Sequence, residues 1–102
     1  MSYQVRFTLD AEADLIRLYE FILEREAIDW HLAEAALAAI RQGIRTLELT
    51  PFICRKAKAN DAFLRELIIP FGSTGYVALF EIENLDWVTV LAVRHQREED
   101  YH

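Results

Sequence analysis

The sequence predicts an α+β fold in which one strand and a helical hairpin precede an antiparallel sheet. Three observations predict it. Residues 3–9 alternate between apolar and polar, residues 10–47 carry apolar side chains at helical spacing in two blocks, and residues 63–93 contain three apolar runs divided by short turns. The expected order is therefore β-α-α-β-β-β. A length of 102 residues predicts one domain, residues 1–102.

The first strand and helix follow from side-chain spacing. The alternation in residues 3–9 places four apolar side chains on one face of a half-buried strand: Tyr3, Val5, Phe7 and Leu9. Thr8 and Asp10 are both capable helix N-caps. The helix is expected from about Asp10 to Glu26, and its apolar stripe is Ala11, Leu15, Leu18 and Ile22.

A second helix follows within a few residues, so the two helices are expected to form an antiparallel hairpin. Asp29 can cap it, and Thr50-Pro51 ends it, because proline disfavours helix in the residue before it. Its apolar residues step by 4, 3, 4 and 3: Ala33, Leu37, Ile40, Ile44 and Leu47. Small residues, including Gly43, allow the first helix or the sheet to approach closely.

A loop is expected over residues 51–62, and three strands after it. The strands are residues 63–69, closed by Pro70, then 76–82 and 87–93. Turns at residues 72–75 and 84–86 are short, and short turns between consecutive strands predict an antiparallel meander.

Composition excludes several classes of function. The apolar fraction of 53% fits a globular protein, and neither a bilayer-spanning run nor an N-terminal signal core is present, so a cytoplasmic protein is expected. The net charge of −6 makes free nucleic acid an improbable main ligand. The charge is uneven, however: residues 35–65 carry +4 and each flanking third carries −5. This basic middle is suited to an acidic protein segment.

Metal and thiol chemistry are not expected. Three His and one Cys show no ligand spacing, so neither a metal nor another cofactor is predicted. Cys54 has Arg55 and Lys56 beside it, which would lower its pKa, but a small apolar packing residue is the simpler interpretation.

The end of the chain is the most informative region for function. The apolar run 90–93 leads directly into Arg94, His95 and Arg97, and Tyr101 follows a triple acid, residues 98–100. Polar residues at the end of a buried strand are held in fixed directions. Arg and His there can grip phosphate or carboxylate, and Tyr can stack or move a proton. The alternative is a solvated tail, which is the simpler reading for Glu98, Glu99 and His102.

Three segments make the chain resemble the RelE/ParE toxin superfamily, and specifically its ParE branch. They are residues 64–71 (LRELIIPF), 75–82 (GYVALFEI) and 90–97 (VLAVRHQR), and the ending 97–101 (REEDY) fits as well. The resemblance implies a toxin of a type II toxin–antitoxin pair. ParE-like toxins poison DNA gyrase, and a ParD-like antitoxin, often carrying a ribbon-helix-helix domain, neutralises them. Operator DNA would then be contacted only through the antitoxin.

Two alternatives stay open. RelE-like toxins cleave messenger RNA in the ribosome, and such an RNase needs a base, cations for the phosphate and an acid. The residues available for it are Lys56, Lys58, Arg65, Arg94, His95 and Tyr101. The acidic ends of the chain argue against an RNA-lined site. The second alternative is an inactive remnant that serves only as an antitoxin partner and corepressor.

Candidate residues divide into two sets. The target-binding candidates are Arg94, His95, Arg97 and Tyr101. The antitoxin-binding candidates combine apolar helix residues with the basic segment: Tyr19, Phe21, Leu23, Trp30, Arg55, Lys56, Lys58 and Arg65. Arg65 has two interpretations of equal weight, a pairing with an acid such as Glu81 or an anion contact on the sheet.

Overall fold

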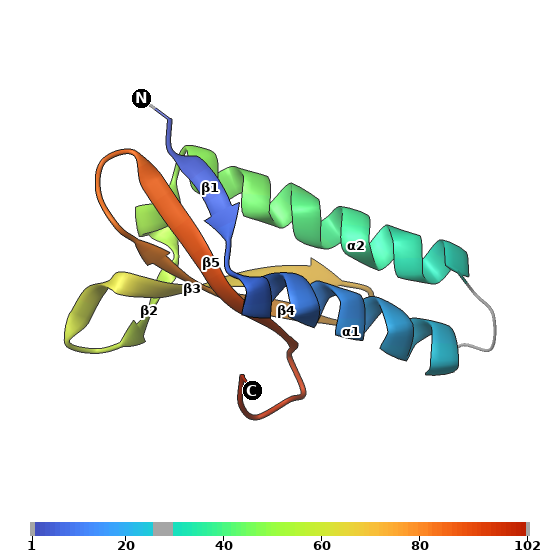
Figure 1. Cartoon of the computed structure of the whole chain (residues 1–102). Helices are drawn as coiled ribbons and strands as arrows, with labels where there is room; N and C mark the ends of the chain where they lie inside the picture. The colour runs from blue at the N-terminus through green and yellow to red at the C-terminus, as the bar shows by residue number, and fades with distance from the viewer. Residues whose placement is uncertain (1, 26–29, 102) are drawn as a thin grey trace.

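A computed structural model describes residues 2–25 and 30–101 of the chain (Figure 1). Its elements in order are β1 (Gln4–Phe7), α1 (Leu9–Arg25), α2 (Trp30–Arg45), the short 3₁₀ turns η1 (Thr46–Glu48) and η2 (Pro51–Ile53), β2 (Arg55–Lys58), β3 (Asp61–Phe71), β4 (Thr74–Ile82) and β5 (Trp87–His95). The predicted α+β architecture is confirmed.

The sheet has five strands in the order β1-β5-β4-β3-β2. Strands β3, β4 and β5 form the expected antiparallel meander, whereas β1 pairs with β5 in parallel, so the sheet is mixed. The loop predicted for residues 51–62 is wrong in its middle, because β2 lies there and pairs with β3 as an edge strand. Its four residues, Arg-Lys-Ala-Lys, show no apolar alternation, and a register shift interrupts the pairing.

Strand β3 also runs past the proline expected to close it. Pro70 pairs with Gly75 and Phe71 with Thr74, next to a turn at Gly72, whose φ is +60°. Proline is tolerated there because the hairpin ends one pair later. Gly75 is required by close approach, since a Cβ on it would lie 2.2 Å from the Ile69 carbonyl oxygen.

The helix boundaries follow from caps and stripes. Of the two candidate caps for α1, Thr8 is used: its hydroxyl accepts the Ala11 amide at 3.1 Å. The expected cap Asp29 lies outside the described residues. Helix α2 ends at Arg45, before the predicted Thr50-Pro51, because the chain tightens into η1 there.

Both helices pack on one face of the sheet, which we call the inner face. Its core joins the apolar stripes of α1 and α2 to inward side chains of the strands: Ala11, Leu18, Ala36, Ile40, Ile44, Leu47, Ile69, Ala78, Phe80, Val88, Val90 and Val93. Gly43 faces the sheet, and a Cβ on it would lie 2.9 Å from the Ile69 side chain. Within residues 2–25 and 30–101 no helix lies on the opposite, outer face, and the chain turns back toward the sheet after β5 (Figure 1).

Candidate functional site at the end of strand β5

Strand β5 sends its last two residues to opposite faces of the sheet. Arg94 lies opposite Val77, and His95 lies opposite the buried Tyr76 of the core. Because successive side chains of a strand alternate, His95 is on the inner face and Arg94 on the outer face. Arg94 and His95, which the sequence analysis grouped in one site, therefore lie on opposite faces of the sheet.

A β-bulge sets this alternation. Leu79 pairs with Ala92 and Phe80 with Val90, so Leu91 is an extra residue on β5. The bulge leaves the Val93 amide for a partner outside the sheet, and the carboxylate of Asp14 on α1 accepts it at 2.9 Å. Asp14 is only 4% exposed. A buried carboxylate thus ties α1 to the bulge and sets the direction of Arg94 and His95.

Both ring nitrogens of His95 are engaged. Nδ1 accepts the Arg97 amide at 3.1 Å, so a neutral ring carries its hydrogen on Nε2, which lies 3.2 Å from the Thr74 hydroxyl. Its ring meets Tyr76 edge to face at 5.5 Å. Burial and the Arg97 charge hold the pKa of His95 below its ordinary value, with Glu98 opposing them. The neutral His95 ring therefore fixes the turn that follows it by accepting the Arg97 amide.

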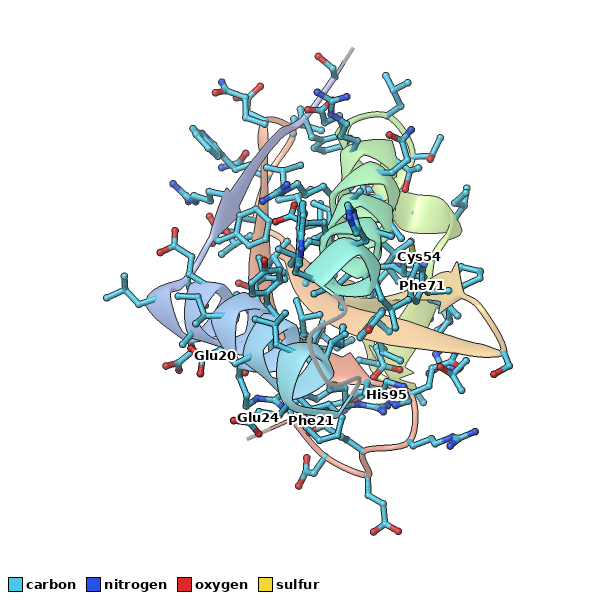
Figure 2. The ribbon with its side chains drawn as sticks, turned by 90° about the vertical axis from the view of Figure 1, so that its right-hand side faces the viewer. Glu20, Phe21, Glu24, Cys54, Phe71 and His95 are labelled. Carbon is cyan, nitrogen blue, oxygen red and sulfur yellow. The ribbon has the colours of Figure 1, made fainter. Side chains whose placement is uncertain are left out.

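His95 also lines a cavity of about 500 Å³ between the helices and the end of the sheet. The lining is largely apolar and includes three charged residues: Arg17, Leu18, Phe21, Ile22, Leu32, Phe71, Thr74, Tyr76, His95, Arg97 and Glu98. Figure 2 looks toward this end of the molecule, with Phe21 of α1 and His95 of β5 in the lower half of the view. An apolar side chain of a partner fits such a cavity, and Arg17 and Arg97 can meet acidic neighbours of that side chain.

Arg94 is held by the tail that follows it. Its Nη1 donates to the carbonyl oxygens of His95, Gln96 and Glu98 at 3.2, 3.4 and 2.6 Å. Its guanidinium carbon lies 5.0 Å from the centre of the Tyr101 ring, within cation–π range. Its Nε is buried without a hydrogen-bond partner.

Tyr101 completes a chain of contacts across the outer face. Its hydroxyl donates to Oε2 of Glu66 on β3 at 2.5 Å, and Oε1 of Glu66 accepts Arg55 Nε of β2 at 3.0 Å. Burial, followed by the Glu66 carboxylate, raises the pKa of Tyr101 well above its ordinary value. The hydroxyl is therefore a donor at all physiological pH values.

The basic residues of β2 and β3 do not gather into an anion-binding site. Lys56 lies opposite Arg65, and both point to the inner side, because Arg65 also pairs with the core residue Phe80. The Arg65 guanidinium donates to the carbonyls of Phe52, Cys54 and Ala62, so its bonds go to the backbone and not to an acid such as Glu81. Lys56 and Lys58 are exposed. Arg65 thus fixes the backbone that leads into β2.

The helix candidates lie apart from one another. The Tyr19 hydroxyl donates to Glu34 of α2, Phe21 lines the cavity, Leu23 is half-buried, and Trp30 is exposed and stacks on His31. Phe21 and Trp30 are therefore the candidates whose apolar surface is open to a partner.

Two residues of this region escaped sequence reasoning. Asp14 and Glu66 belong to neither of the candidate sets drawn from the sequence. The signal for Asp14 was present: it lies three residues after Ala11 and four before Leu18, so it falls on the buried stripe of the helix. Nothing local marks Glu66, whose partners lie 11 and 35 positions away.

Thiol and metal chemistry gain no support from the described part of the chain. The expected lowering of the Cys54 pKa is wrong: burial raises it, although Arg65 opposes the shift. Residues 2–25 and 30–101 contain no cluster of three or more metal-ligating side chains. Among the same residues, no helix is long and apolar enough to cross a membrane.

Comparison with known proteins adds a family and a fold. The family model described as "ParE toxin of type II toxin-antitoxin system, parDE" matches residues 5–100. The structure is similar to a solved chain titled "Chromosomal ParDE TA system from P. aeruginosa", with a TM-score of 0.72 and 17% identity over 91% of this chain and 95% of that one. No curated protein sequence matches the chain.

Proposed function

Because the chain belongs to the ParE toxin family of type II toxin–antitoxin systems, we propose that it acts in the cytoplasm by binding and poisoning DNA gyrase. Gyrase as the target is what the ParE branch implies. The toxin then inhibits its target by binding and catalyses no reaction. Its target-binding residues are Arg94, His95, Arg97 and Tyr101.

The division of candidate residues between two faces carries this proposal against the RNase alternative. Lys56 and Arg65 share the inner side, whereas Arg94 and Tyr101 are on the outer face. General acid–base cleavage needs its groups within hydrogen-bond reach of one phosphate. Arg65 and Tyr101 also have donors occupied by backbone carbonyls and by Glu66.

Family membership implies a ParD antitoxin partner. We place its contacts on the open apolar side chains of the helical layer, Phe21 and Trp30, and on the exposed lysines of β2, Lys56 and Lys58. Tyr19, Leu23, Arg55 and Arg65 support those surfaces through their own contacts. A ribbon-helix-helix domain on the antitoxin would carry operator binding, so the toxin meets that DNA only indirectly.

The test is antitoxin-free protein titrated into gyrase supercoiling and DNA-cleavage assays. We expect supercoiling to be lost and linear DNA to accumulate. Arg97→Ala, which removes an exposed cation, is expected to weaken inhibition, whereas Arg41→Ala, an exposed cation on α2, leaves it unchanged. If gyrase is untouched at concentrations that arrest growth, the proposal is wrong. Message cleavage in a translation extract would then separate an RNase from an inactive partner protein.

A further inference from the structure

The outer face of the sheet is partly covered, although both described helices lie on the other face. Val77 and Ala92 point to this face, and each is only 2% exposed. The cover is the chain's own end: Tyr101 bonds Glu66 of β3 and lies over Arg94 of β5. Since β4 lies between those strands, the Tyr101 ring spans it. We call residues 96–101 the strap.

The strap is attached at its two ends. At its start, the Gln96 amide donates to the Gly75 carbonyl at 2.9 Å, the Glu98 amide donates to the His95 carbonyl at 3.0 Å, and Arg94 holds the turn through its carbonyls. At its far end, Tyr101 is the anchor. Glu99 and Asp100 between them are exposed, and the Asp100 carboxylate accepts the amide of Tyr101. Because the Tyr101 ring also lies against Arg94, which holds the turn, loss of the Tyr101 contact would loosen both attachments and free the strap as a unit.

The closed strap leaves Arg94 incompletely satisfied. None of the ion pairs of residues 2–25 and 30–101 includes Arg94; its Nη1 has only carbonyl acceptors, and its buried Nε has none. A buried donor without an acceptor is unfavourable. A carboxylate that reached the guanidinium would supply charge-assisted bonds in a forked geometry. Arg94 therefore gains when an anionic group replaces the strap.

We propose that the outer face of the sheet is a docking surface for an acidic, partly apolar segment of the toxin's target protein, and that the strap covers it until Tyr101 leaves Glu66. Arg94 takes a carboxylate of that segment, and Ile68, Val77 and Leu79 beside it meet its apolar side chains. The identity of the target rests on the proposed function. The surface itself does not.

Two carboxylates of this face, Glu66 and Glu83, are already paired with arginines, which singles out Arg94 as the cation left for an acidic partner. Glu66 keeps Arg55 as a partner after Tyr101 leaves, and Glu83 pairs with Arg6 at the opposite end of β5. Glu81 also lies on this face, two residue pairs beyond the Glu66–Leu79 pair, and would repel an acidic segment placed there. An acidic segment is thereby directed to the Arg94 end of the sheet.

The strap lowers affinity in the free protein, because a partner binds only the open fraction. Tyr101→Phe removes the hydroxyl that bonds Glu66 and keeps the ring. The matched control is Tyr19→Phe, whose hydroxyl also bonds a carboxylate, Glu34, but on the helical layer. We expect Tyr101→Phe to raise the open fraction by about threefold or more and Tyr19→Phe to leave it unchanged.

Hydrogen exchange by NMR tests the strap on the whole chain. In Tyr101→Phe, the amides of Gln96 and Glu98 are expected to exchange faster by the same factor, while amides of α1 keep their rates. Tyr101→Ala, which also removes the ring over Arg94, is expected to accelerate them further. Unchanged exchange rates of the Gln96 and Glu98 amides in both variants would overturn the proposal that Tyr101 holds the strap closed.

The docking surface is tested with a ten-residue peptide of alternating glutamate and valine, followed through the Nε–H resonance of Arg94. We expect this resonance to move at lower peptide concentration in Tyr101→Phe than in wild type, and a glutamine–valine peptide to leave it in place. No movement in the open variant, or movement with a single-stranded oligonucleotide but not with the peptide, would overturn the proposal. Gyrase inhibition measured in parallel reports on the proposed function alone.

Discussion

The inner and outer faces of the sheet are buried by different means. The inner face is covered by two helices whose apolar stripes meet inward side chains such as Phe80 and Val90, both fully buried. The outer face is covered by a six-residue segment held by Tyr101, Glu66 and Arg94. Apolar burial stabilises in proportion to area and is lost only with the fold, whereas a few polar contacts can be exchanged for others. The inner face therefore maintains the structure, and the cover of the outer face is the part that we propose a partner replaces.

The largest expected effect comes from the inner face. Phe80→Ala removes the largest fully buried side chain from beneath both helices and is expected to lower the free energy of unfolding by about 3–5 kcal/mol. Urea unfolding measures it. Leu85→Ala, at a side chain that is 73% exposed, is the control and should change stability by less than about 0.5 kcal/mol. Equal losses in the two variants would contradict the division between the faces.

A smaller effect is expected where α1 meets the bulge. Asp14→Ala leaves the buried Val93 amide without its acceptor, so we expect a loss of about 1.5–3 kcal/mol in the same assay. Asp14→Asn keeps an oxygen acceptor and should lose less. If Asp14→Ala is no worse than Glu24→Ala on the exposed side of α1, then Asp14 does not support the bulge.

The smallest effect is a pH dependence at the junction of the faces. Because the pKa of His95 is lowered in the folded chain, the unfolded chain binds a proton first as pH falls through about 6.5. The contribution of neutral His95 to the free energy of unfolding is present above that pH, and it is lost as pH falls toward the pKa of His95 in the folded chain. A proton on Nδ1 also displaces the Arg97 amide.

His95→Gln should therefore flatten the fall in unfolding free energy between pH 7.5 and pH 5.5. Arg17, Arg97 and Glu98 surround the ring and remain in the variant. His31→Gln, at an exposed position of α2, is the control for removing a histidine. Parallel pH profiles for wild type and His95→Gln would show that His95 is not responsible.

Sequence reasoning reached the helices, four of the five strands and the family, because each depends on local patterns. The stripe of α1 contains Ala11 and Leu18, the stripe of α2 contains Ile40 and Ile44, and all four side chains are buried. Strand β2 escaped because its lysines and alanine carry no alternation, and only pairing with β3 makes it a strand.

The site was less predictable because it depends on one bulge and on distant contacts. Uninterrupted alternation from Val88 and Val90 would send Arg94 to the inner face, but the extra residue Leu91 reverses the order and sends His95 there. Glu66 meets Tyr101 across 35 positions. Neither the bulge nor that contact leaves a local signal, so the sequence identified Arg94, His95 and Tyr101 as important while missing that they face different ways.

The central claim is that the cover of the outer face opens separately from the rest of the fold. Native-state hydrogen exchange of the wild-type chain tests it most directly, by comparing the Gln96 and Glu98 amides with those of Val90 and Val93. The account predicts that the strap amides exchange through a local opening that needs little denaturant, while the β5 amides exchange only through global unfolding. One common opening free energy for all four amides would contradict it.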